Sequence, residues 1–133
     1  MLSGGGCADY GSAYSAAVEQ TGVRWIIWIT GMGIHREIEG VHGLMLNRLA
    51  KKMPAYIQAA DTIAASAAVT TLLRCPSIRD GENQAYALTK EGQQPDCWTV
   101  DRVAIARCMA DMVADDALGA NESLGTTNRK ESV

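Results

Sequence analysis

The chain contains the stretch Val23-Arg24-Trp25-Ile26-Ile27-Trp28-Ile29-Thr30, and Gly31-Met32-Gly33 follows it directly. An apolar run of β-branched and aromatic residues without alternation is typical of a strand that is buried on both faces in a helix-covered parallel sheet. Open α/β sheets bind ligands at the carboxyl ends of their strands, where the loops diverge. The stretch therefore predicts an α/β fold with a ligand near the glycines that follow it.

The remaining sequence alternates helical and strand patterns around this strand. Apolar residues at helical spacing predict helices over 8–20, 44–52 and 55–66, and a further helix that is capped by Thr99 or Asp101 and ends at Asp115. Strands are predicted over 69–74, 85–90 and 123–127, and 31–43 is predicted as a long loop. This order predicts a layered fold with right-handed crossovers and a mostly parallel sheet. We expect strands 23–30 and 69–74 to be parallel, with helices 8–20, 54–66 and 100–115 packed on the sheet.

The composition narrows the class of protein. The 133 residues suffice for one domain, and 47% of them are hydrophobic. The net charge of −3 and the lack of a basic stripe argue against nucleic acid as a partner. The longest apolar run is shorter than the roughly 18 residues of a membrane span, and residues 1–7 do not resemble a secretion signal. We therefore expect a cytoplasmic protein without a membrane partner.

The cysteines and histidines do not form a metal-binding pattern. Cys7, Cys75, Cys97 and Cys108 contain no C-x-x-C pair, so they are interpreted as reduced thiols. The two histidines are seven residues apart in a glycine-containing segment, which is not the usual helical ligand spacing. No metal site is predicted.

Four segments together resemble a known family. Residues 26–34, I-I-W-I-T-G-M-G-I, resemble the "hydrophobic-I-S-S-x-G-I" strand and loop of the atypical short-chain dehydrogenase/reductases, the NmrA-like NAD(P)H-binding proteins. Residues 54–61 resemble the "P-Y-x-A-A-D" helix of these proteins, and residues 100–106 their "V-S-R-x-x-V-A" helix start. Residues 70–76 resemble the "Y-T-I-L-R-P" strand, with a cysteine where proline is usual. The order and spacing of the four segments are kept between about residue 8 and residue 127.

The resemblance covers only the C-terminal half of the family. It implies that residues 1–127 form the C-terminal part of a three-layer, Rossmann-like NAD(P)-binding domain and that residues 128–133 form a polar tail. The family's G-x-x-G-x-x-G turn, which holds the dinucleotide pyrophosphate at a helix N-terminus, has no match here. By position, Gly5 resembles a loop beside the cofactor; alternatively, it belongs to a chain end without a ligand role. We therefore expect NADP or NAD to bind weakly without the N-terminal half.

The same resemblance suggests individual site residues. Thr30 stands where the family has its first serine, and it either bonds substrate or cofactor or bonds its own loop. Tyr56 lies on the corresponding helix, but Ala60 replaces the lysine that would lower the pKa of the tyrosine, so packing against the sheet or cofactor is expected rather than proton donation. Gly31, Cys75 and Pro76 complete the predicted cofactor contacts. Pro76 is expected to shape the turn rather than contact a ligand, although the two roles are compatible, and no neighbouring base is evident that would activate the Cys75 thiol.

Three functions are compatible with these features. The resemblance favours an NAD(P)H-binding, short-chain dehydrogenase/reductase-like protein, present as a truncated oxidoreductase. A redox-sensing or regulatory domain that binds the cofactor without catalysis is the second alternative. The third is a fragment that forms a homo-oligomer through the exposed sheet edge that the missing half leaves, since an unpaired edge can template pairing with another strand.

Overall fold

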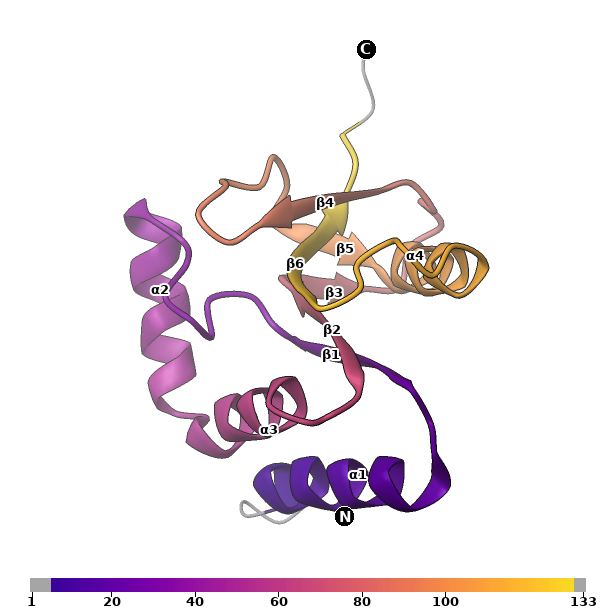
Figure 1. Cartoon of the computed structure of the whole chain (residues 1–133). Coiled ribbons are helices and arrows are strands. Elements are labelled where there is room, and N and C mark those ends of the chain that lie inside the picture. Colours follow the sequence, from indigo (N-terminus) through magenta and orange to yellow (C-terminus); the bar gives the residue numbers. More distant parts are fainter. Residues whose placement is uncertain (1–5, 131–133) are drawn as a thin grey trace.

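The computed structural model describes residues 6–130 and has a central sheet with helices on both sides (Figure 1). The elements, in chain order, are α1 (Gly6–Thr21), β1 (Trp25–Gly31), α2 (Gly40–Lys51), α3 (Pro54–Ala64), β2 (Val69–Cys75), β3 (Ser77–Arg79), β4 (Tyr86–Lys90), β5 (Thr99–Asp101), α4 (Arg102–Ala114) and β6 (Glu122–Asn128). None of the helices between residues 6 and 130 combines the length and apolar content of a bilayer-spanning segment.

The main sheet has four strands in the order β1-β2-β6-β4. β1 and β2 are parallel, with Trp25 opposite Val69 and Gly31 opposite Cys75, which confirms the predicted pairing of the two apolar strands. β6 continues the parallel sheet and β4 closes it antiparallel to β6. β3 and β5 form a separate, short parallel pair. The mostly parallel α/β fold is therefore confirmed. The carboxyl ends of β1 and β2 lie side by side.

The side chains of β2 alternate between two buried faces of the sheet, which explains why two consecutive leucines occur in this strand. Leu72 packs with Ala60 and Ile63 of α3 on one face of the sheet. Its neighbour Leu73 packs on the other face, in a core cluster to which α4 contributes Cys108, among others. Because helices cover both faces, successive residues of the strand are buried in opposite directions.

The first helix is placed differently from the prediction. α1 packs chiefly against α3 rather than on the sheet, at the bottom of Figure 1. A Cβ at Gly11 would lie 3.0 Å from the backbone of Ala59, so the glycine allows the two helices to approach closely. The ring of Tyr14 meets Trp28 of β1 edge-on, with 5.5 Å between ring centroids.

The predicted loop over 31–43 is shorter than expected because α2 begins within it, at Gly40. Gly40 has a φ of +75°, a conformation that side chains rarely adopt. Gly43 lies in the first turn of α2, where a Cβ would collide with the carbonyl oxygen of Ile38. The glycines that suggested a loop therefore let the chain turn tightly into the helix.

The start of α4 agrees with one of the two predicted N-cap residues, Asp101, whereas the start of the predicted tail differs from the prediction. Thr99 lies in β5, and Asp101 ends β5 at the N-cap position of α4. The Asp101 carboxylate does not cap the helix: it accepts a hydrogen bond from the Asn83 N–H at 3.0 Å. Asn128, predicted as part of the polar tail, instead ends β6 in a buried position, because its side-chain oxygen accepts the Asp101 N–H at 2.7 Å.

Candidate functional site

A cavity of about 430 Å³ lies at the carboxyl ends of β1 and β2. The two strands end side by side here, with Gly31 opposite Cys75. α2 and the first turns of α3 supply the opposite wall. The described residues that line the cavity are Thr30, Gly31, Met32, Ile34, Leu46, Leu49, Ala50, Met53, Tyr56, Ile57, Cys75, Pro76, Ser77 and Ile78.

The structure brings five of the six predicted site residues to this one cavity, namely Thr30, Gly31, Tyr56, Cys75 and Pro76. Gly5, the sixth, lies outside the described residues. The ring of Tyr56 lies against Gly31: a Cβ on the glycine would be 3.6 Å from the ring edge, which is ordinary contact. These five residues therefore line one cavity, and their contact with a cofactor stays a prediction.

Thr30 is a buried polar residue that lines the cavity. It is 1% exposed, and its hydroxyl oxygen has no hydrogen-bond partner among residues 6–130. The alternative in which this hydroxyl bonds its own loop is therefore not observed. A buried hydroxyl without a partner costs about 1–3 kcal/mol, so such a group needs an explanation.

Cys75 lines the cavity but does not act as a nucleophile. Burial, and secondarily the nearby Cys108, raises the pKa of the Cys75 thiol to about 12. The thiol is therefore protonated at neutral pH, and it is the thiolate that acts as the nucleophile. This agrees with the interpretation that no base activates this cysteine.

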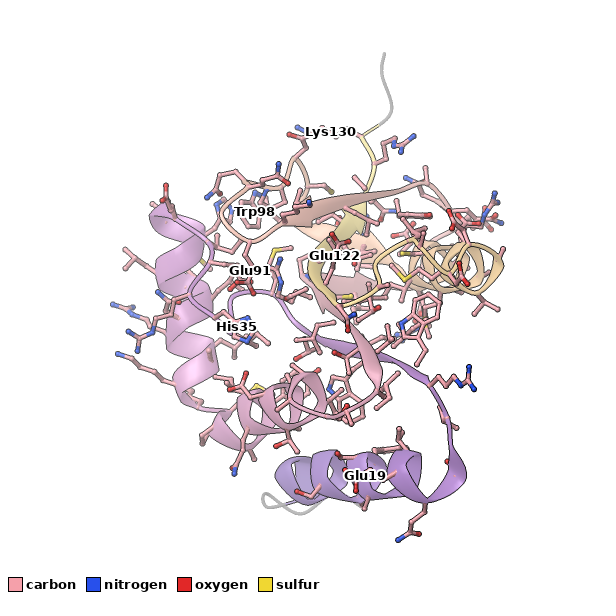
Figure 2. The ribbon with its side chains drawn as sticks, in the orientation of Figure 1. Glu19, His35, Glu91, Trp98, Glu122 and Lys130 are labelled. Carbon is pink, nitrogen blue, oxygen red and sulfur yellow. The ribbon has the colours of Figure 1, made fainter. Side chains whose placement is uncertain are left out.

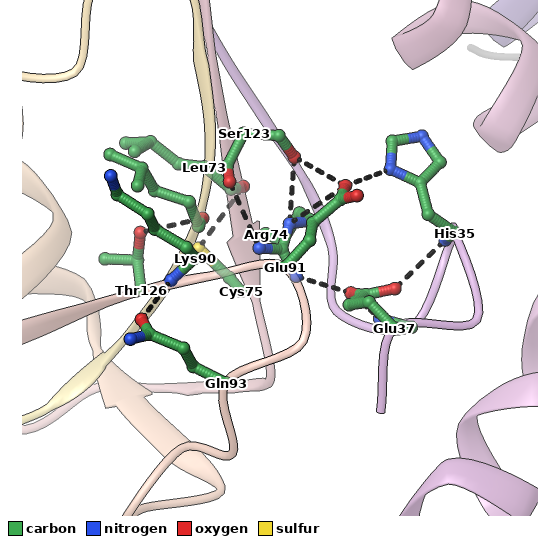
Figure 3. A network of polar contacts seen from close by, with 12 residues as sticks. His35, Glu37, Leu73, Arg74, Cys75, Lys90, Glu91, Gln93, Ser123 and Thr126 are labelled. Atoms are coloured by element: carbon green, nitrogen blue, oxygen red, sulfur yellow. Dashed lines mark hydrogen bonds and ion pairs between the residues drawn. The ribbon is translucent and has the colours of Figure 1, made fainter. Parts of the chain in front are cut away.

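A buried ion pair that the sequence analysis missed lies beside these strand ends (Figure 3). Arg74 Nη1 donates to Glu37 Oε1 at 2.6 Å, and the side chains are 1% and 3% exposed. Arg74 also donates from Nε to Ser123 Oγ at 2.9 Å. Glu37 in turn accepts the backbone N–H groups of Gly33 and His35, at 2.7 and 3.1 Å. The pair therefore anchors the loop after β1 to β2 and β6.

The electrostatics of Glu37 follow from these bonds. Burial raises the pKa of the carboxyl, but hydrogen bonds from Gly33 and Arg74 outweigh burial and hold the pKa below 4.5. The sequence did contain a signal for this pair. A charged residue such as Arg74 inside an otherwise apolar strand needs a buried partner, and the carboxylates of the following loops were the available candidates.

His35 forms a second connection from the same loop, and Figure 2 shows it next to Glu91. Its Nδ1 lies 2.5 Å from Glu91 Oε1 and its Nε2 lies 3.1 Å from Asp61 Oδ1. Partial burial lowers the pKa of His35, but the two carboxylates outweigh it and the pKa lies above 6.5. Within the part of the chain that the structure describes, no three His, Cys, Asp or Glu side chains gather as a metal site would require.

The wall from α2 was also missed as a site feature. Leu46, Leu49 and Ala50 of α2 line the cavity, at sequence intervals that place side chains on one helical face, and Met53, the N-cap residue of α3, continues this wall. Leu49 is 56% and Met53 42% exposed, so this wall reaches solvent. The helical spacing was visible in the sequence, but it does not reveal which side of the helix meets a cavity.

Comparisons with known proteins identify the family and the fold of this chain. A family model described as NAD(P)H-binding matches residues 3–116. Among solved structures, a wide-type short-chain dehydrogenase/reductase of Veillonella parvula in complex with NADP has a TM-score of 0.74 and 22% identity, and the match covers 96% of this chain and 59% of that one. A Rossmann-fold NAD(P)-binding family protein of Shigella flexneri has a TM-score of 0.66 and 21% identity, with 96% and 59% covered. The oxidoreductase ylbE of Lactococcus lactis has a TM-score of 0.67 and 13% identity, with 89% and 52% covered.

These matches establish the family and the fold. No curated protein matches the chain in sequence. The chain spans about 59% of the length of the Veillonella and Shigella structures that it matches. The family match confirms the predicted resemblance to NAD(P)H-binding proteins, and the structural neighbours confirm the Rossmann-like architecture. The chain belongs to the NAD(P)H-binding family whose model covers residues 3–116, and it has the fold of Rossmann-type dehydrogenases.

Proposed function

We propose that the cavity at the ends of β1 and β2 receives the nicotinamide end of NAD(P)H, as part of an oxidoreductase site. The observation that carries the proposal is the Thr30 hydroxyl, which is buried without a partner in the wall of this cavity. Its position agrees with the general rule that open α/β sheets bind ligands at the carboxyl ends of their strands. The Veillonella parvula neighbour, described as a complex with NADP, supports the choice of cofactor.

The residues present fit the nicotinamide end of the cofactor. The cavity combines apolar walls with one unsatisfied hydroxyl, which suits a flat ring that carries a carboxamide. When bound, NAD(P)H supplies two electrons for reduction. Thr30 would bond the carboxamide or a substrate carbonyl, Tyr56 would pack against the ring, and Glu37 with Arg74 would hold the loop after β1 in place.

The residues do not fit the pyrophosphate equally well. Among the described residues that line the cavity, none is a cation. Phosphates in Rossmann sites are bound at a helix N-terminus behind a glycine-rich turn, and this sequence has no G-x-x-G-x-x-G motif. We therefore expect this chain alone to bind the dinucleotide weakly, through its nicotinamide end.

The proposed oxidoreductase lacks the lysine that usually activates the tyrosine acid. Ala60, fully buried in the core, stands four residues after Tyr56, where a lysine would be needed to lower the pKa of the tyrosine. This observation favours a second candidate function, an NmrA-like regulatory domain that binds the cofactor without turnover. Retained reduction of a carbonyl substrate in the presence of NADPH would distinguish the enzyme from the regulator.

Self-association is a further proposal for the partners of this chain. β1 is an edge of the main sheet, and no strand within residues 6–130 pairs with its outer side. The strand contains no charged residue or proline, the features that protect natural edges from pairing. Sedimentation velocity tests the proposal: a dimer that Ile29→Lys disrupts supports it, and a monomer at all concentrations contradicts it. We also propose a cytoplasmic location, which the free thiols of Cys75 and Cys108 support, with cell fractionation as the test.

Titration of NADPH fluorescence against the purified chain tests the cofactor proposal. We expect saturable binding weaker than about 100 μM, which corresponds to about −5.5 kcal/mol. Thr30→Val should weaken the binding about two- to tenfold, the value of one neutral hydrogen bond. Thr62→Val is the matched control, because Thr62 is a half-buried α3 residue outside the cavity lining whose hydroxyl donates to the Gln58 carbonyl. Absence of saturable binding, or equal effects of the two variants, would contradict the proposal.

A further inference from the structure

The cavity wall is uncharged. Among the described residues that line it, none has an ionised side chain at neutral pH. Arg74 is adjacent to Cys75 in sequence, but its guanidinium donates to Glu37 and to Ser123. That cation is already neutralised by a carboxylate at 2.6 Å, so it does not offer a charge to a ligand. An anionic group that entered the cavity would lose water without gaining a counter-ion.

The apolar part of the wall is extended. Met32 and Ile34 come from the loop after β1, Leu46 and Leu49 from α2, and Ile78 from β3. Leu49 and Ile78 are 56% and 40% exposed, so the apolar surface continues to the solvent side of the cavity. Large apolar side chains left partly exposed beside a cavity are typical of a site that buries an apolar ligand.

The wall contains one buried polar group whose bonding is incomplete. The Thr30 hydroxyl oxygen has no partner among the described residues, although Thr30 is only 1% exposed. A hydroxyl can donate one hydrogen bond and accept others. It therefore suits a neutral acceptor such as a carbonyl oxygen, which needs one donor and brings no charge.

We propose that this site takes a neutral, largely apolar carbonyl compound as its substrate and discriminates against carboxylates and phosphates of the same shape. The proposal rests on the oxidoreductase function proposed for the same cavity. Selectivity arises because the apolar wall contributes to the binding of both kinds of compound, while only the anion pays an uncompensated desolvation cost.

A nearly isosteric pair of probes tests this selectivity. 2-Acetylnaphthalene carries a neutral ketone, and 2-naphthoate places a carboxylate at the same ring position. Binding is followed by the methyl NMR signals of ¹³C-labelled methionine in the full chain. Met32 and Met53 line the cavity, whereas Met109 and Met112 lie on α4. We expect the ketone to shift the first two signals and to bind at least tenfold more tightly than the carboxylate. Equal or tighter binding of the carboxylate, no binding of the ketone, or shifts confined to α4 would overturn the proposal.

A matched pair of variants tests whether the cavity itself sets the selectivity. Leu49→Lys places a cation on the lining face of α2, while Leu44→Lys makes the same change at a residue of α2 that is 66% exposed and is not among the lining residues. We expect Leu49→Lys to reduce the preference for the ketone at least threefold and Leu44→Lys to leave it unchanged. Equal effects would show that net charge, not the cavity wall, governs binding, and would overturn the proposal.

The two proposals for this cavity fail in different ways. If NADPH does not bind but the ketone is preferred at Met32 and Met53, the cofactor function is wrong and the selectivity of the cavity stands. If NADPH binds and shifts the same signals but the carboxylate binds as well as the ketone, the inferred substrate class is wrong and the cofactor function stands.

Discussion

The two buried threonines Thr30 and Thr71 should respond to the same substitution in opposite ways. Both lie in parallel strands of the main sheet and are at most 1% exposed. The Thr30 hydroxyl has no partner among the described residues. The Thr71 hydroxyl donates to the Gly119 carbonyl at 2.7 Å and accepts the Trp25 ring N–H at 2.9 Å. Valine keeps the shape of threonine and removes the hydroxyl, so each variant isolates the contribution of its hydrogen bonds.

The expected magnitudes follow from these partners. Thr30→Val removes an unsatisfied buried hydroxyl, for which the penalty is about 1–3 kcal/mol. The oxygen is buried from solvent as well as unpartnered, so its removal is stabilising, and we expect the free energy of unfolding to rise by about 1 kcal/mol, the lower end of this range. Thr71→Val leaves the Gly119 carbonyl and the Trp25 N–H without their partner, so we expect a loss of about 1–3 kcal/mol. The two variants should therefore differ by about 2–4 kcal/mol.

Urea unfolding followed by tryptophan fluorescence measures both changes. The midpoint should move upward for Thr30→Val and downward for Thr71→Val, with an unchanged slope for each. In the NADPH titration, the more stable Thr30→Val protein should be the weaker binder, as expected where a functional residue is retained at a cost in stability. A decrease in stability of 1 kcal/mol or more in Thr30→Val would show that its hydroxyl is satisfied, and would refute the reasoning.

Other perturbations have equally defined outcomes. Arg74→Met should lower the free energy of unfolding by about 3–5 kcal/mol, because it leaves Glu37 buried without its cation. Adding Glu37→Met should recover at least half of that loss, as measured by urea unfolding. A double variant that is no more stable than Arg74→Met would contradict this interpretation of the ion pair. The pKa of His35 lies above 6.5 in the folded chain, so its ion pairs stabilise the fold fully below that pH, and their contribution of about 0.5–1 kcal/mol disappears as the pH rises through the folded pKa. His35→Gln should remove this part of the pH dependence of stability, which urea midpoints measured from pH 5.5 to 9 report. An unchanged pH dependence in the variant would count against the role of His35. If the chain reduces a carbonyl substrate with NADPH, Tyr56→Phe should change turnover little, because Ala60 leaves the tyrosine without its lysine; a hundredfold loss would identify Tyr56 as the proton donor.

Local sequence predicted much of the architecture and the position of the cavity. The uninterrupted apolar stretch before Gly31 reflects a strand covered on both faces, and a pattern of that kind is visible without any partner. Because parallel strands end at a common edge, the residues after β1 and β2 could be expected to meet, and Thr30, Gly31, Cys75 and Pro76 do line one cavity. Tyr56 was placed there by its resemblance to a family motif.

Only the tertiary structure decided the remaining features, because each depends on residues that are distant in sequence. The pairing of Arg74 with Glu37 spans 37 positions, and no local pattern selects Glu37 over the other carboxylates. The short strands β3 and β5 have three residues each and are defined by one another, not by periodicity. Gly11 and Gly43, which local rules treat as helix-weakening, are used for close contact between backbones. The missing bond of Thr30 is likewise a property of the whole fold, since a hydroxyl is unsatisfied only when every surrounding segment fails to supply a partner.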